Sequence, residues 1–279
     1  MNSIKQKERT TQTISHVVLI TFALTALVPI LLVFINSFKP HAEIVRNPLA
    51  PPTHLSLQNF TDAWTAGKFS TGFINSIILS GTTVIVTVIA STCMGYVLAG
   101  RKIKEYKLIM AYFLVAMTVP IQLFLIPLYI AFSRLNLISN LVAIGFVLAA
   151  LNLPLAILLM RTFFLKVPLE LEEAARIDGA STWQVLRNIM LPIVSPGIIT
   201  VAIIVGLYSW NEFLITSTFI SGQSHYTATL GFLSMNGTYT SNQGPLMAGA
   251  MIMIVPVVIF FLLMQKYFID GLTSGAVKG

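Results

Sequence analysis

Residues 166–192 read KVPLELEEAARIDGASTWQVLRNIMLP and hold four of the ten acidic residues in a chain of 279. Pro168 suits the first turn of a helix, and Gly179 suits the left-handed backbone position just after a helix ends. Glu172 and Arg176 are four residues apart, which allows a helix-supporting ion pair. The first half of this stretch therefore predicts a helix that ends in a glycine turn.

The second half of the stretch carries its own helix signals. Ser181 and Gln184 fit a capping box at the start of a second helix, and Pro192 would end or kink that helix. Clustered acids beside the small side chains of Ala174 and Ala175 allow two interpretations. The stretch is either a connector with a solvated acidic face or a segment that docks closely into a cleft of a partner.

The composition of the rest of the chain excludes most soluble classes. Apolar residues make up 56% of the chain, charged residues only 10%, and the mean hydropathy is +0.83. Soluble domains have about 45–50% apolar and about 25% charged residues, so a soluble enzyme or nucleic-acid binder is excluded. A single cysteine, Cys93, excludes a disulfide framework, and four scattered histidines leave little for a metal site.

Long runs without charged residues set the architecture. A hydrocarbon core about 30 Å thick requires about 20 apolar residues in a helix. Backbone polar groups in lipid must be satisfied internally, and the runs do not alternate as barrel strands do. The sequence therefore predicts an all-α polytopic membrane protein. The six expected spans are 13–37, 72–98, 108–132, 139–160, 195–220 and 246–268.

The distribution of basic residues predicts the orientation. With the N-terminus in the cytoplasm, 13 of the 17 Lys and Arg residues fall in cytoplasmic segments. The net charge of +7 is then explained by topology, and we expect no nucleic-acid partner. The first span is longer than the apolar region of a signal peptide and lacks a cleavage site after Phe38, so we interpret it as an uncleaved anchor.

The chain contains none of the motifs expected of a catalytic or nucleotide-binding site. It has no P-loop, no zinc-protease motif and no nucleophile elbow. We therefore expect no catalytic residue, no metal and no cofactor in this chain, and a role as a transporter, channel or scaffold.

A resemblance to a known family makes this expectation specific. Glu173-Ala174-Ala175, Gly179, Ile189 and Leu191-Pro192 have the order and spacing of the EAA motif of permeases of ATP-binding-cassette (ABC) importers. Asp178-Gly179-Ala180 is the form of the sugar branch. The chain end, 271–279, and Trp210-Asn211-Glu212-Phe213 resemble MalG-like permeases. The resemblance covers roughly residues 70–279.

The resemblance implies a type I ABC-importer permease fold with a cytoplasmic coupling helix. Residues 1–68 would form an N-terminal tail, the first span and an outer loop. Residues 69–270 would form the transport domain, with the EAA segment at 166–193, and 271–279 a cytoplasmic tail. The implied ATPase-coupling residues are Glu170, Glu173, Ala174, Ala175, Asp178, Gly179, Ala180, Ile189 and Pro192. The tail residues implied to contact the ATPase are Gly271, Leu272, Gly275 and Lys278.

The same resemblance implies the partners. They are a second, MalF-like permease, two cytoplasmic ATPase subunits that bind ATP-Mg, an extracytoplasmic sugar-binding protein, an oligosaccharide and membrane lipid. The protein would lie in the bacterial inner membrane with both termini in the cytoplasm. The outer loop 221–244 would touch the binding protein. The alternatives are an importer for amino acids or peptides and a secondary transporter that works alone.

Asn211 and Glu212 are the candidate substrate-path residues. An ionisable group at membrane depth usually faces a cavity or a partner, but Asn and Glu also hold helices together. Both interpretations of this pair stay open at the level of sequence.

Overall fold

The computed structural model describes residues 2–100, 103–237 and 242–276, and over those ranges it consists of helices and connecting segments. The α-helices of the first half are α1 Asn2–Ser37, α2 His41–Arg46, α3 Gln58–Ala66, α4 Phe69–Ala99, α5 Tyr106–Ala116, α6 Leu125–Arg134 and α7 Leu141–Phe164. Those of the second half are α8 Leu169–Ile177, α9 Thr182–Val185, α10 Leu191–Trp210, α11 Leu214–Phe219, α12 Ala228–Ser234 and α13 Gln243–Ala276. Three short segments are 3-10 helices: η1 Ile121–Phe124, η3 Gln223–His225 and η4 Met235–Gly237. The segment η2 Leu186–Met190 is a π-helix.

The chain forms two compact units. The first comprises Met1–Gly67 and Phe232–Val255, and the second comprises Lys68–Gly231 and Pro256–Gly279. In the first unit, Asn59 of α3 donates hydrogen bonds from Nδ2 to the carbonyls of Ser37 (3.0 Å) and Lys39 (2.8 Å). The buried Lys39 ammonium donates to the carbonyl of Asn47 at 3.2 Å. These contacts tie the segment after α1 to α3.

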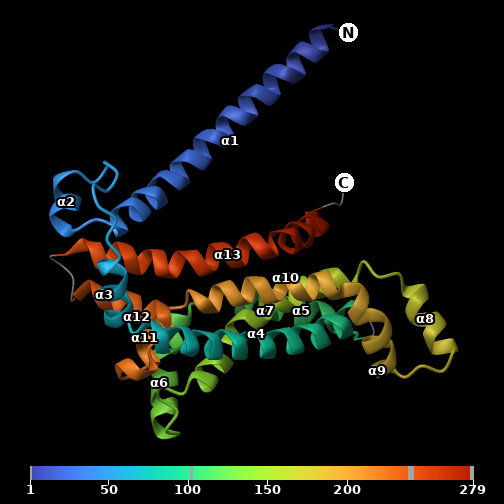
Figure 1. Ribbon diagram of the computed structural model, residues 1–279. Coiled ribbons are helices and arrows are strands. Elements are labelled where there is room, and N and C mark those ends of the chain that lie inside the picture. The colour runs from blue at the N-terminus through green and yellow to red at the C-terminus, as the bar shows by residue number, and fades with distance from the viewer. Residues whose placement is uncertain (1, 101–102, 238–241, 277–279) are drawn as a thin grey trace. The chain divides into compact units, whose positions relative to one another are not determined.

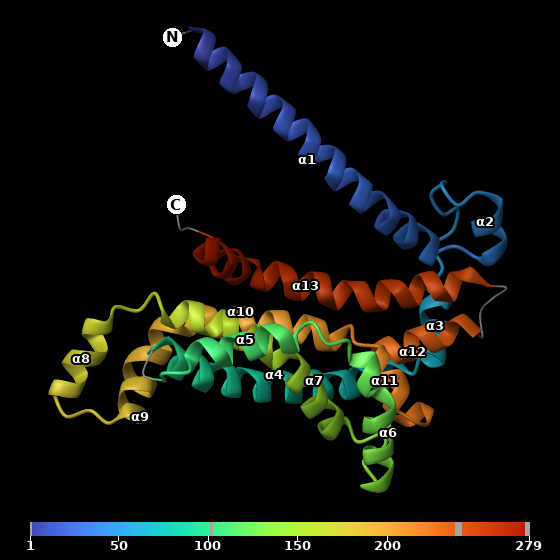
Figure 2. The same cartoon turned by 180° about the vertical axis from the view of Figure 1, so that it is seen from behind.

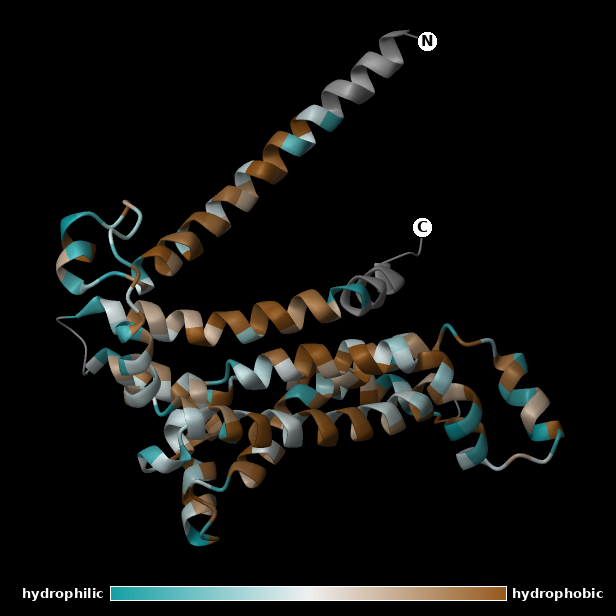
Figure 3. Cartoon of the chain, viewed as in Figure 1, coloured by the Kyte–Doolittle hydropathy of each residue, from teal (hydrophilic) through white to brown (hydrophobic). Residues whose placement is uncertain are grey.

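The second unit is built on α4, α7 and α10, which lie side by side in both views (Figures 1 and 2). The helices α8 and α9 lie at one end of this bundle, and α6 and α11 lie at the other. Hydrophobic colour dominates the three long helices, whereas α8 and α9 carry much of the hydrophilic colour at their end (Figure 3).

Five of the six predicted spans are present as single helices, and the span predicted over 108–132 corresponds to a bent pair of helical segments. Among the described residues, five helices are long and apolar enough to cross a membrane, and a sixth span is formed if Tyr106–Ala116 and Ile121–Arg134 count together. These two segments meet at 85°. The break between them ends at Pro120, whose own backbone is extended, and a proline also biases the residue before it away from the helical conformation.

The fifth span differs from the sequence prediction at both ends. Thr182–Trp210 is one helical run, so Pro192 does not end the helix. The N–H of Leu191 donates to the carbonyl of Leu186, five residues back, which is the wide turn of a π-helix. Proline has no N–H to donate, and the widened turn directly before Pro192 accommodates that loss. The helix then ends at Trp210, although the apolar run continues to residue 220.

Candidate functional site

The helix α8 ends as its sequence predicts. Gly179 has a φ of 84°, in the left-handed region. Its N–H donates to the carbonyl of Arg176 at 3.1 Å, and the N–H of Ala180 donates to the carbonyl of Ala175 at 2.9 Å. This pair of bonds is a Schellman motif, and glycine is the residue that adopts its left-handed position without a Cβ penalty. The glycine turn predicted at 179 is therefore present.

The predicted capping box is also present. The N–H of Gln184 donates to Ser181 Oγ at 3.3 Å, while Gln184 Oε1 accepts from the N–H of Ser181 at 2.7 Å. Two N–H groups that would lack a helical partner are satisfied in this way. The result is a compact α8–turn–α9 segment, 169–185, at the end of the bundle (Figure 1). We call it the coupling segment.

The nine predicted coupling residues divide by exposure. The carboxylates of this set and the turn lie in solvent, and two small residues pack inward. Exposed are Glu170, Glu173, Ala174, Asp178, Gly179 and Pro192; partly buried are Ala175, Ala180 and Ile189. Ala175 and Ala180 pack against a core cluster that contains Tyr96 and Val185. The small residues therefore seat the segment on the bundle, while the acids face outward.

Two large apolar side chains on the outer face were not predicted as site residues. Ile177 is 86% exposed and Trp183 is 61% exposed. In sequence, Ile177 precedes the Gly179 turn and Trp183 follows it, and the carboxylate of Asp178 between them is exposed. Exposed aromatic and aliphatic groups of this size are typical anchors of protein interfaces. The sequence signal was the presence of Ile and Trp in a segment that the sequence predicts to lie outside the membrane.

Glu172 is a further residue that the sequence did not assign to the site. Its side chain is buried, with 5% exposure, and its Oε1 accepts from Arg176 Nη2 at 2.8 Å and Arg176 Nε at 3.0 Å. The hydroxyl of Tyr96, in α4, donates to the same oxygen at 3.3 Å. The hydrogen bond with Glu172 raises the pKa of Arg176 above its ordinary value, so the guanidinium stays charged. The spacing of Glu172 and Arg176 predicted their ion pair, but nothing in the sequence predicted that Tyr96 would join it.

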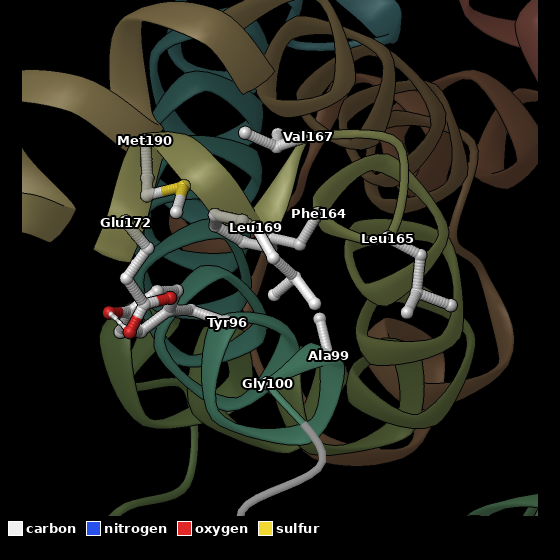
Figure 4. Close-up of a pocket in the computed structure, with 9 residues that line it drawn as sticks. All are labelled: Tyr96, Ala99, Gly100, Phe164, Leu165, Val167, Leu169, Glu172 and Met190. Carbon is white, nitrogen blue, oxygen red and sulfur yellow. Dashed lines mark hydrogen bonds between the residues drawn. The ribbon is translucent and has the colours of Figure 1, made fainter. Parts of the chain in front are cut away.

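A cavity of about 260 Å³ lies between the start of α8 and the end of α4. Its lining residues are Tyr96, Ala99, Gly100, Phe164, Leu165, Val167, Leu169, Glu172 and Met190. Figure 4 shows the carboxylate of Glu172 beside the hydroxyl end of Tyr96, with the apolar side chains around the rest of the cavity. The polar contact thus closes one side of an otherwise apolar space.

The two candidate path residues have different environments. Glu212 is buried, and its carboxylate accepts from the N–H groups of Ile215 at 2.6 Å and Thr216 at 2.9 Å, at the start of α11. Asn211 is exposed, and its amide donates to the carbonyl of Leu207 at 2.8 Å. Both residues follow the end of α10 and lie in the turn before α11, so they fall within the span predicted over 195–220 but not in a helix.

The predicted tail residues are described only in part. The helix α13 extends to Ala276, so Gly271, Leu272 and Gly275 belong to its last turns. Lys278 lies outside the described residues. Metal-binding clusters of three or more His, Cys, Asp or Glu side chains are absent from the part of the chain that the structure describes.

Comparison with known proteins identifies the family. A family model described as "Binding-protein-dependent transport system inner membrane component" matches residues 91–273, a range that includes the coupling segment. The chain belongs to this family. Its members are membrane components of transport systems, so the protein is a multi-pass membrane permease and has no catalytic activity of its own.

Relatives of this permease match over most of their length. The arabinooligosaccharides transport system permease protein AraQ of Halalkalibacterium halodurans is 34% identical over 98% of this chain and 100% of the relative. The trehalose transport system permease protein SugB of Mycobacterium tuberculosis is 29% identical over 91% of this chain and 93% of the relative. A solved bacterial ABC transporter, involved in alginate import, matches with a TM-score of 0.77 at 22% identity, over 94% of this chain and 98% of that chain. The ABC-importer permease fold predicted from sequence is therefore confirmed.

Proposed function

We propose that this permease is a subunit of an ATP-driven, binding-protein-dependent importer of oligosaccharides. The observation that carries the proposal is the coupling segment, which combines a Schellman turn, exposed acids and exposed apolar anchors on a chain without a P-loop. The names of the relatives, which transport arabinooligosaccharides, trehalose and other sugars, support the substrate class. They favour sugars over the amino acids or peptides of the alternative interpretation.

The coupling segment is proposed to bind an ATPase subunit. Ile177 and Trp183 would enter an apolar cleft, while Glu173 and Asp178 would meet basic side chains at its rim. ATP-Mg would be bound and hydrolysed by two such subunits, and this chain would bind no cofactor. When the two ATPase subunits close on ATP, their movement would be transmitted to the spans through α8 and α9.

The proposed orientation places α8 and α9 in the cytoplasm with both termini. The excess of Lys and Arg in the segments predicted to be cytoplasmic supports this topology. The opposite end of the second unit, with α6, α11 and η3, would then face the extracytoplasmic binding protein. The last turns of α13, with Gly271, Leu272 and Gly275, and Lys278 after them, would approach the ATPases. Unchanged uptake after deletion of 273–279 would remove the deleted residues, among them Gly275 and Lys278, from the mechanism.

Transport is proposed to proceed by alternating access between this permease and a second, MalF-like permease. Large apolar side chains of α5 are exposed in the isolated chain, as expected for a surface that lipid or a companion subunit covers. Asn211 and Glu212 would contribute to the sugar path by fixing the turn between α10 and α11, since both side chains already bond backbone groups there.

Reconstitution of the whole proposed complex tests this function. The permease is co-purified with the companion permease and the ATPase proposed above, and the complex is placed in proteoliposomes with the binding protein. Arabinooligosaccharide, trehalose and diacetylchitobiose serve as probes, with amino acids and peptides as controls. We expect one sugar to stimulate ATP hydrolysis and to enter the vesicles. Stimulation by an amino acid or peptide alone, or uptake by this chain alone in an ion gradient, would overturn the proposal.

A further inference from the structure

We propose that Tyr96 is a positioning residue. Its hydroxyl links the coupling segment to α4 and thereby couples ATP hydrolysis to transport. The inference rests on the proposed function and adds to it one specific contact, the hydrogen bond from Tyr96 to Glu172.

The chain connectivity explains why such a contact is needed. The coupling segment is joined covalently to α7 through residues 165–168 and to α10 through the continuous run from α9. It is not joined in this way to α4, because Tyr96 and Glu172 are 76 residues apart in sequence. A movement of α8 therefore reaches α7 and α10 through the backbone, whereas α4 depends on side-chain contacts.

The packing between α8 and α4 leaves few such contacts. The cavity of about 260 Å³ separates Leu169 of α8 from Ala99 and Gly100 at the end of α4. At its side, the Tyr96 hydroxyl and the Glu172 carboxylate meet (Figure 4). Both side chains are buried, and a hydrogen bond to a charged group is among the stronger polar contacts in a protein. The polar contact therefore bridges a space that apolar packing does not fill.

The two ends of this bridge are held firmly. Arg176 fixes Glu172 from α8 through two hydrogen bonds and itself lies within 3.4 Å of Thr182 Oγ1 at the start of α9. The Tyr96 ring packs on Phe164 of α7 with centroids 5.6 Å apart. A shift of the coupling segment would thus pull on α4 through a bond whose donor and acceptor have little freedom.

The test uses the full complex in proteoliposomes and measures the sugar transported for each ATP hydrolysed. The probe is whichever of arabinooligosaccharide, trehalose and diacetylchitobiose stimulates the wild-type complex most. Tyr96→Phe removes the hydroxyl but keeps the ring. We expect it to retain its ATPase subunits and its ATP hydrolysis, while uptake per ATP falls at least about fivefold, as for loss of a typical coupling between two sites. Thr162→Val, which removes a hydroxyl whose hydrogen bond to the Leu158 carbonyl stays within α7, is the control and should leave the ratio unchanged.

A second pair of variants separates positioning from general stability. Glu172→Gln keeps an oxygen acceptor for Tyr96 and should retain more coupling than Glu172→Met, which has none. The double variant Tyr96→Phe/Glu172→Met should be no worse than Glu172→Met alone, because Glu172→Met already removes the acceptor of the Tyr96 hydroxyl. A wild-type ratio in Tyr96→Phe, additive losses in the double variant, or loss of the ATPase subunits in both tyrosine and glutamate variants would overturn the inference. Absence of sugar-stimulated hydrolysis in the wild type would instead contradict the proposed function.

Discussion

Gly95 of α4 lies so close to Met160 of α7 that a Cβ at Gly95 would come within 2.8 Å of the Met160 Cβ. The same Cβ would lie 3.0 Å from the backbone nitrogen of Arg161 and 3.1 Å from the carbonyl carbon of Met160. Backbone atoms of a helix cannot move aside as the end of a side chain can. The close approach of α4 and α7 at their coupling-segment end therefore depends on the absence of a side chain at Gly95.

Gly95→Ala is expected to destabilise the permease by about 1–3 kcal/mol, because an added methyl group in a packed interface forces backbone shifts. Thermal unfolding in detergent, followed by the loss of the monodisperse peak, measures the effect. Gly81→Ala is the matched control, since Gly81 lies in the same helix and a Cβ there meets nothing within 4 Å. An equal loss of thermal stability in both variants would contradict the role assigned to the Gly95 contact.

Gly179→Pro is expected to abolish uptake and to weaken co-purification of the ATPase, while membrane insertion stays normal. Proline fixes φ near about −65°, far from the 84° of Gly179, and its nitrogen cannot donate to the carbonyl of Arg176. Gly179→Asn is the control, because asparagine tolerates the left-handed region better than other residues with a side chain. Full uptake and ATPase binding in the proline variant would show that the turn is not part of the coupling surface.

Ile177→Glu is expected to weaken ATPase binding at least about fivefold, the effect of losing an interface anchor worth about 1 kcal/mol or more. The fold should be unaffected, since the side chain is almost wholly exposed. Binding of purified ATPase to the permease in nanodiscs measures the change. Leu55→Glu, at an exposed leucine between α2 and α3, is the control. If the two variants bind the ATPase equally well, Ile177 is not an anchor.

The sequence predicts the local geometry of the coupling segment well because its signals are local. Gly179, Ser181 and Gln184 act through hydrogen bonds that reach five residues or fewer. Tyr96 could not be predicted as a partner of Glu172, because nothing local to either residue specifies a contact across 76 positions. The helix-supporting pair with Arg176 was visible, but burial of that pair is a property of the packed bundle.

The spans likewise have features that the sequence predicts and features that it does not. The number of spans can be predicted from the runs without charged residues, because each run is long enough to cross the membrane as a helix. The ends of the spans cannot be predicted in this way. The apolar run continues from α10 into α11, so hydropathy does not show that α10 ends at Trp210. The 85° bend before Pro120 had a local signal in that proline, which the search for charge-free runs ignores. Orientation and partners stay predictions.

Glu212 caps α11 with both carboxylate oxygens, and this contact leads to the last prediction. The N–H groups of Ile215 and Thr216 would lose their acceptor in Glu212→Ala, at a buried position. Loss of a helix-capping side chain costs about 0.5–2 kcal/mol, and leaving a buried donor unsatisfied costs about 1–3 kcal/mol. We therefore expect Glu212→Ala to lower the thermal stability of the complex clearly, and Asn211→Ala, at an exposed residue, to change it little.

Glu212→Gln separates capping from a direct role in the sugar path. A glutamine side chain presents one oxygen in place of two, so we expect an intermediate loss of stability. The order of preference among arabinooligosaccharide, trehalose and diacetylchitobiose should stay as in the wild type, because the carboxylate is already occupied by backbone N–H groups. Thermal unfolding and competitive uptake in proteoliposomes measure the two effects. A changed order of sugars with normal stability would instead place Glu212 in contact with the substrate.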